Sequence, residues 1–193
     1  MKKSYLLIVF ISFFLLNCEK KEEVANVPYI ISKEEREFKK RLEEGNIPPP
    51  PTGFYGSSNV IIDKEGELYF YQRTYYGVLG CIVEENPLPE FINLQPKDLV
   101  KIPSTAVGDF LKENTVKNPR EKWEHLIVAC QLDTLKSEGF FNIMHFLRDN
   151  QVPIYLIRRT TQEEDVVLKF KESNVFYDSD SIQWDKSRIR FFE

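Results

Sequence analysis

The chain has 193 residues and a mass of 22.8 kDa, which suits one domain with additional segments. Its 42% hydrophobic and 29% charged residues exclude a disordered chain, a collagen-like chain and a membrane protein with several spans. Lys and Arg number 26 against 30 Asp and Glu, and loss of Lys2 and Lys3 with a leader changes the net charge from −4 to −6. This acidic balance argues against a nucleic-acid partner, whose recognition requires a basic face.

The first 17 residues have the pattern of a signal peptide. Lys2 and Lys3 precede residues 5–16, a run of twelve mostly apolar residues without a charge. A helix that crosses a bilayer needs about 20 apolar residues, so this run is too short to span it. A basic start followed by a short apolar stretch is typical of export signals. We therefore predict a cleaved leader at residues 1–17.

The cysteine that follows this run indicates how the protein is anchored. Leu15-Leu16-Asn17-Cys18 resembles the lipobox of bacterial lipoproteins, and its polar Asn17 is similar to the variant found in the Bacteroidota. The resemblance implies that Cys18 carries acyl chains such as palmitate. Each CH₂ group of these chains that is buried in the bilayer adds about 0.8 kcal/mol to the free energy of membrane binding. We expect a lipid-anchored protein of the cell envelope, on the periplasmic or surface face of the outer membrane. An ordinary secretory leader with a chance cysteine is the alternative.

Residues 18–53 are predicted to form a tether between this anchor and the folded domain. Ser32 followed three residues later by Glu35 is a capping box, which predicts a helix at about 33–44. The four prolines at 48–51 predict a polyproline strut of about 12 Å. The helix has a narrow apolar stripe, so a solvated spacer is favoured over a partner-binding helix.

Residues 54–193 are predicted to form one α/β domain. Two β-prone runs, 59–63 and 67–71, flank Lys64-Glu65-Gly66 and predict a hairpin, and a further strand is expected at 75–83.

The second half of the domain predicts a strand, helix and strand in a parallel crossover. The elements are a helix at 104–114, a strand at 126–130 buried on both faces, a helix at 137–149, a strand at 152–157, and edge strands at 166–170 and 188–192. The predicted fold is therefore a small mixed sheet with two helices packed on it.

The order of these elements from Asn59 to Arg159 resembles the periplasmic domain of the ExbD/TolR family. The resemblance rests on the hairpin at 60–69, on helices that contain Phe110-Leu111-Lys112-Glu113 and Ile143-Met144-His145-Phe146-Leu147-Arg148, and on the final strand at 154–157. ExbD and TolR are coupling subunits of proton-driven inner-membrane motors whose periplasmic domains bind partner proteins or cell wall. Their membrane helix carries an aspartate, whereas residues 5–16 have no carboxylate. The resemblance therefore implies an envelope-exposed binding domain rather than a motor.

Candidate catalytic and metal-binding residues are few. His125 precedes the buried strand and His145 lies on the polar side of its helix, and neither H-x-x-x-H nor C-x-x-C occurs. Motifs for a nucleophile elbow or a phosphate loop are also absent from the sequence. The acidic groups Glu163-Glu164-Asp165 and Asp178-x-Asp180 lack the glycine and distal glutamate of a calcium loop. We predict no metal, no cofactor and no catalytic residue.

Two cysteines remain once Cys18 is acylated. Cys81 and Cys130 both follow apolar runs and lie in an oxidising compartment, so a disulfide between adjacent strands is one interpretation. Two buried free thiols that pack as small hydrophobic groups are the other.

The sequence leaves two classes of function. The first is a noncatalytic binding or scaffold module that holds envelope proteins or peptidoglycan by a sheet edge or by exposed aromatic residues such as Tyr75 and Tyr76. The second is a hydrolase that acts on an envelope polymer, with Glu84 and Glu85 as its acid–base material. Neighbouring carboxylates on a strand point to opposite faces, so we predict the binding module.

Overall fold

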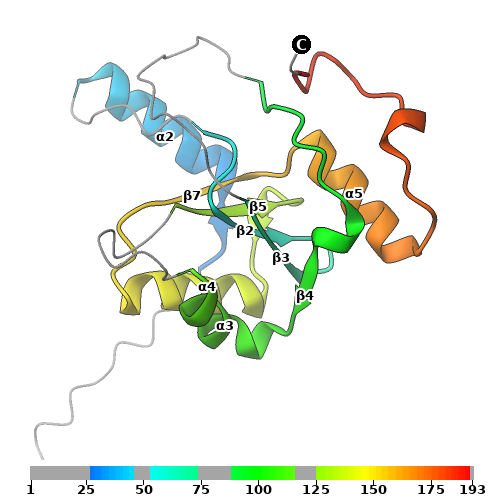
Figure 1. The fold of residues 1–193 in the computed structure, drawn as a ribbon. Helices are drawn as coiled ribbons and strands as arrows, with labels where there is room; N and C mark the ends of the chain where they lie inside the picture. Colours follow the sequence, from blue (N-terminus) through cyan, green and yellow to red (C-terminus); the bar gives the residue numbers. More distant parts are fainter. Residues whose placement is uncertain (1–26, 46–52, 74–87, 116–124, 192–193) are drawn as a thin grey trace, which may run out of the picture.

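The computed structural model describes residues 27–45, 53–73, 88–115 and 125–191, and these form a mixed α/β domain (Figure 1). A five-stranded sheet has the order β4-β3-β2-β5-β7. β2 pairs antiparallel with β3 and β3 with β4, whereas β5 runs parallel to both β2 and β7. The strands are β2 (Ser58–Ile62), β3 (Leu68–Gln72), β4 (Val100–Ile102), β5 (Leu126–Cys130) and β7 (Tyr155–Arg159).

The predicted hairpin, central strand and parallel crossover are confirmed, and β4 is a strand that the sequence analysis did not predict. The hairpin turn forms because Gly66 adopts a φ of 88° and the Asp63 carboxylate accepts the Glu67 N–H at 2.8 Å. The last crossover strand lies at Tyr155–Arg159 rather than at 152–157. The strand predicted at 75–83 lies outside the described residues.

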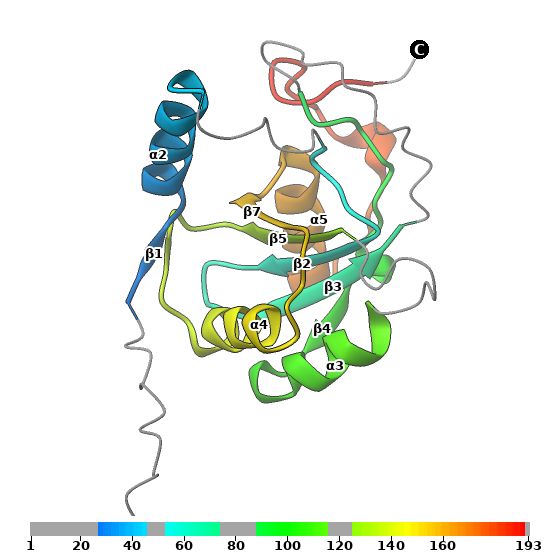
Figure 2. The same ribbon diagram turned by 90° about the vertical axis from the view of Figure 1, so that its left-hand side faces the viewer.

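Two helices cover one face of the sheet, as predicted: α3 (Val107–Asn114) and α4 (Glu138–Asp149) (Figure 2). The Ser137 hydroxyl accepts the Phe140 N–H at 3.3 Å and caps α4. The apolar positions of both helices pack on inward side chains of the central strands. This core includes Val60, Ile62, Leu111, Val128, Phe140, Ile143 and Leu147.

The opposite face is covered by α5 (Gln162–Ser173), so the edge strand predicted at 166–170 is wrong. The Thr161 hydroxyl accepts the Glu164 N–H at 3.2 Å, and the Glu164 carboxylate accepts the Thr161 N–H at 2.8 Å. This capping box starts a helix whose Val167 and Leu168 are buried against the sheet. A short apolar run fits a strand or a helix equally well, and the cap decides between them.

The strand predicted at 188–192 is also not formed in the described residues, which end at 191. A single parallel bridge joins Glu90 to Arg190. The described residues also contain short 3₁₀ turns at Pro96–Asp98, Ser104–Ala106 and Ser179–Ser181.

The described part of the predicted tether packs on the domain. Strand β1 (Tyr29–Ile30) pairs antiparallel with β6 (Thr134–Leu135) and leads into α2 (Ile31–Glu43). Ser32 does not cap this helix. Its N–H and hydroxyl instead donate to the two Asp133 carboxylate oxygens at 2.9 and 2.8 Å, and Ile31 is buried in the core.

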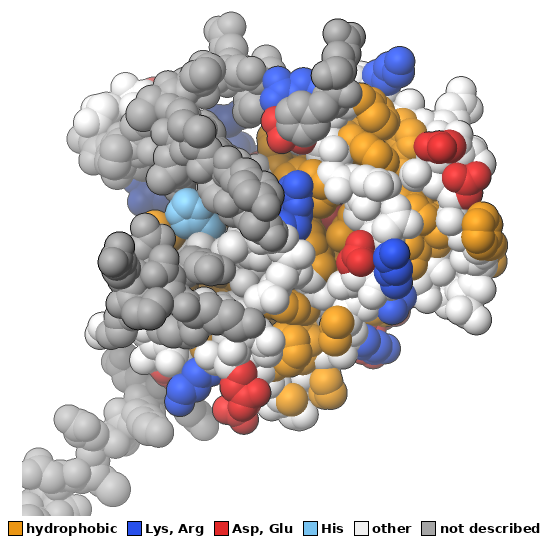
Figure 3. Space-filling view, in the orientation of Figure 1, with side chains coloured by type: hydrophobic (Ala, Val, Ile, Leu, Met, Phe, Trp, Pro, Cys, Tyr) orange, Lys and Arg blue, Asp and Glu red, His pale blue; other side chains and the backbone are white. Residues whose placement is uncertain are grey.

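Across the described ranges, none of the helices has both the length and the apolar character that a membrane span requires. On the face seen in Figure 3, basic and acidic side chains are interspersed with hydrophobic ones over the described surface. The described part of this face therefore shows no continuous basic patch of the kind that nucleic acids bind.

Candidate binding edge

β7 is an outer strand of the sheet, and among the described residues no strand pairs with its far side (Figure 2). Helix α2 packs against β7. The Leu126 N–H donates to the Ile154 carbonyl at 3.4 Å, and the Thr160 N–H donates to the Cys130 carbonyl at 3.1 Å. Backbone groups of successive residues in a strand alternate between its two sides, so the even-numbered residues from 154 to 160 face β5. Tyr155, Ile157 and Arg159 therefore direct their N–H and C=O groups away from β5, to the side without a strand partner.

Apolar side chains accompany this open backbone. Ile154, Tyr155 and Leu156 are 39%, 44% and 37% exposed. Tyr155 is in register with Leu126 and faces the α3/α4 side, whereas Leu156 is in register with Ile127 and faces the α5 side. An exposed strand edge with apolar side chains on both faces is a template for pairing with another extended chain. We call Tyr155–Arg159 with Ile154 the β7 edge.

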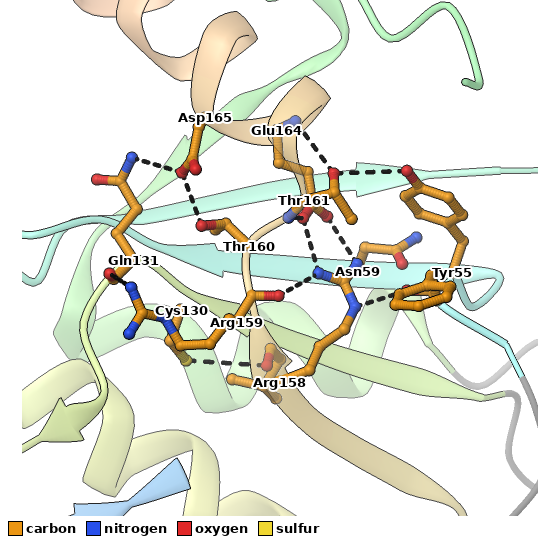
Figure 4. A network of polar contacts seen from close by, with 12 residues as sticks. Tyr55, Asn59, Cys130, Gln131, Arg158, Arg159, Thr160, Thr161, Glu164 and Asp165 are labelled. Carbon is orange, nitrogen blue, oxygen red and sulfur yellow. Dashed lines mark hydrogen bonds and ion pairs between the residues drawn. The ribbon is translucent and has the colours of Figure 1, made fainter. Parts of the chain in front are cut away.

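A buried ion pair fixes this strand from beneath (Figure 4). Arg158 reaches from β7 to Glu164 at the start of α5, with its two terminal nitrogens 2.8 and 2.9 Å from the carboxylate oxygens. Its Nε donates to the Phe54 carbonyl at 2.7 Å, and the Tyr71 hydroxyl donates to Glu164 at 2.7 Å. Burial opposes charge on Glu164, yet Arg158 and these hydrogen bonds hold its pKa below the ordinary value.

The neighbouring Glu163 has a different environment. Its two oxygens accept the Ile92 and Leu94 N–H groups at 2.9 and 2.7 Å, which holds the 92–94 segment against α5. Burial raises the pKa of Glu163 to about 7 because these two hydrogen bonds only partly compensate for lost hydration. Both glutamates are fully buried and accept hydrogen bonds from the protein. They therefore stabilise the fold and are not accessible to a substrate.

The structure does not bring the candidate histidines together. His125 directly precedes β5, and His145 lies on α4 with its Nδ1 2.9 Å from the Arg148 guanidinium. The Asp178 carboxylate accepts the Asp180 N–H at 3.1 Å and so stabilises a 3₁₀ turn. A different group, Asp63, Glu65 and Glu172, has carboxylate oxygens within 4.8 Å of one another. Asp63 is buried and the two glutamates are exposed, and acidic groups are often close together without a metal, so we assign no site there.

Of the predicted site cysteines, Cys18 and Cys81 lie outside the described residues, as do Tyr75, Tyr76, Glu84 and Glu85. Cys130 ends β5 and is completely buried, and burial raises the pKa of its thiol to about 12. The disulfide between Cys81 and Cys130 stays a prediction. Burial alone makes Cys130 unsuitable as a nucleophile.

The β7 edge was missed because the strand predicted at 152–157 was not assigned to an outer position in the sheet, and the edge strands were expected at 166–170 and 188–192. The apolar run 154–156 followed by Arg158 and Arg159 is a signal for a strand that ends in a charged setting, but it does not indicate which strand lies outermost. Comparison with protein-family models, curated proteins and solved structures found no match to this chain.

Proposed function

We propose that this protein is a membrane-anchored lipoprotein of the cell envelope and acts as a noncatalytic binding module. Its β7 edge takes an extended segment of an envelope protein as an added strand. The observation that carries the proposal is the open backbone of Tyr155, Ile157 and Arg159 next to exposed apolar side chains.

This edge favours a protein segment over peptidoglycan glycan. The outward N–H and C=O groups recur at every second residue, about 6.6–6.8 Å apart, and an extended peptide offers complementary groups at the same interval. Ile154, Tyr155 and Leu156 add apolar surface on both faces, which suits alternating side chains of a partner strand. The buried Arg158–Glu164 pair holds the strand in place before a partner arrives, which lowers the ordering cost of binding.

The anchor in this proposal is acylated Cys18. Ten residues separate Cys18 from Tyr29, where β1 joins the domain, and ten extended residues span at most about 36 Å. Pairing of β1 with β6 therefore keeps the domain close to the bilayer. A short distance between the domain and the bilayer raises the effective concentration of the β7 edge for partners at the same membrane.

A crosslinking experiment tests the binding edge. A photoreactive phenylalanine analogue replaces Leu156 in the intact lipoprotein, which is then irradiated in its own envelope. Tyr155→Pro removes one outward N–H and leaves the hydrogen bonds to β5 intact, and Tyr155→Val is the matched control that keeps the N–H. We expect a protein adduct, mapped by mass spectrometry to an extended segment, that Tyr155→Pro abolishes and Tyr155→Val retains. An adduct to glycan, or one that Tyr155→Pro leaves unchanged, would contradict the proposal.

A second experiment tests the anchor. Cys18→Ser should abolish fatty-acid labelling and release the protein from the membrane fraction. Retention in the membrane with unchanged labelling would show that Cys18 is not the anchor.

A further inference from the structure

The outward positions of β7 are complementary to themselves. When a second β7 is laid antiparallel alongside the first with the two Ile157 residues opposite each other, Tyr155 of each copy lies opposite Arg159 of the other. All three pairs are then of the hydrogen-bonded type, because all three residues direct their backbone groups outward. Pro153, two residues before Tyr155, has no N–H to donate. The hydrogen-bonded pairing between the two strands is therefore limited to these three pairs.

We propose that the strand taken by the β7 edge is β7 of a second copy of this chain. This inference rests on the proposed function, because it names the partner of the same edge. The two five-stranded sheets join around a two-fold axis through the paired Ile157 residues and form one continuous sheet.

The side chains favour this partner. In the antiparallel arrangement, opposite side chains lie on the same face, so the Arg159 guanidinium of one copy lies against the Tyr155 ring of the other. Arg159 is exposed, donates to the Gln131 carbonyl and forms no salt bridge to a carboxylate in the described part of the chain. The central Ile157 pair is apolar, and no pair places like charges opposite each other. A register shifted by two residues in either direction would place Ile157 opposite Tyr155 or Arg159 and lose the pairing of Tyr155 with Arg159.

Dimer formation also removes the open edge. Each paired β7 gains a neighbour on its free side, and the two outer edges of the joined sheet are both β4. The dimer carries two acyl anchors, which strengthens its attachment to the membrane through avidity.

Cysteine pairing tests the register in the full-length protein. Two differently tagged copies are expressed together in the native envelope, one with Tyr155→Cys and the other with Arg159→Cys, and then oxidised. Directly opposite residues have Cα atoms about 5.5 Å apart, within the range that a disulfide bridges. Copies that both carry Tyr155→Cys, or both Arg159→Cys, place their cysteines about 14 Å apart and serve as controls. We expect a mixed crosslinked dimer of the two tags and no dimer from either control.

A second measurement does not depend on the introduced cysteines. Sedimentation of the mature chain with Cys18→Ser should show a dimer whose dissociation constant rises at least about tenfold in Tyr155→Pro and much less in Tyr155→Val. Equal crosslinking in the mixed and control pairs, or a monomer at every concentration, would overturn the inference. If the photoreactive residue at 156 meanwhile captures a different envelope protein in a manner that Tyr155→Pro abolishes, the proposed function stands and only the second copy is excluded. If it captures neither, both fail.

Discussion

The two edges of the sheet carry similar charged groups and use them in opposite ways. At the β4 edge, which has three residues and is followed by Pro103, Lys101 forms a 3.0 Å ion pair with Glu67, and both side chains are about half exposed. At the opposite edge, where strand β7 has five residues, the 2.8 Å pair of Arg158 and Glu164 is buried beneath the strand. Ile154, Tyr155 and Leu156 leave the first half of β7 exposed and apolar, and the exposed Arg159 ends the strand.

This difference shows how the position of a charge decides what an edge does. A lysine on a short edge strand deters another strand, because pairing would bury its charge. A charge pair beneath a strand holds that strand in place and leaves its edge free to pair. The β4 edge is therefore protected, and the β7 edge is stabilised and open.

The largest effect is expected from removal of the support beneath β7. Arg158→Ala leaves the Glu164 carboxylate buried without its partner, so the free energy of unfolding should fall by about 3–5 kcal/mol in urea titration. The control is Arg159→Ala at the neighbouring exposed position, which should cost less than about 1 kcal/mol. Equal losses in the two variants would show that the buried pair does not anchor the strand.

The next effect separates Glu163 from its neighbour Glu164. Because burial raises the pKa of Glu163 from 4.5 to about 7, its contribution to stability is present at low pH and is lost as the pH rises through 7. Glu163→Gln does not titrate. The free energy of unfolding of the wild type, relative to that of this variant, should therefore fall by about 2–3 kcal/mol between pH 4 and pH 8. Urea titrations across that range would contradict the assignment if the difference stayed constant or rose with pH.

A lysine placed on β7, like the one that protects β4, should change the stability little and the association strongly. Leu156→Lys places a cation on an exposed position of the β7 edge and should change the free energy of unfolding by less than about 0.5 kcal/mol. Association through β7 should be lost, and sedimentation measures this loss. Leu132→Lys, at an exposed apolar position outside the strands, is the matched control and should leave association unchanged.

The smallest effect is expected from the reverse change. Lys101→Val removes the charge from the β4 edge and should produce a weak new association at high protein concentration, detected by light scattering. Lys97→Val, in the 3₁₀ turn that precedes β4, is the control and should stay unchanged. An absence of any difference between the two would show that Lys101 does not protect the edge.

Local patterns were sufficient for much of the fold. The hairpin follows from two β-prone runs around a glycine turn, and α4 follows from the Ser137 cap and its apolar positions at helical spacing. The uncharged apolar run of β5 indicated a central strand, which the structure confirms. In each case the signal lies within about a dozen consecutive residues, because caps, turns and side-chain periodicity are local properties.

Local patterns failed where a contact between distant segments decided the outcome. Ser32 was predicted as a cap. Its N–H and its hydroxyl instead donate to the carboxylate of Asp133, which lies about 100 positions later in the chain, next to β6. The run 166–170 was predicted as a strand, although the Thr161 capping box and burial against Ile61 and Tyr69 make it part of α5.

By itself, the sequence determined the α/β class, the two helices on one face and the parallel pairing of β5 with β7, because each depends on short-range periodicity and capping. Only the tertiary structure decided that β7 is an edge, since an apolar run such as 154–156 looks the same whether a neighbouring strand covers it or not. It also decided that Arg158 and Glu164 pair. These residues lie six positions apart in the chain, and their guanidinium and carboxylate meet because α5 folds back over the face of the sheet from which Arg158 projects.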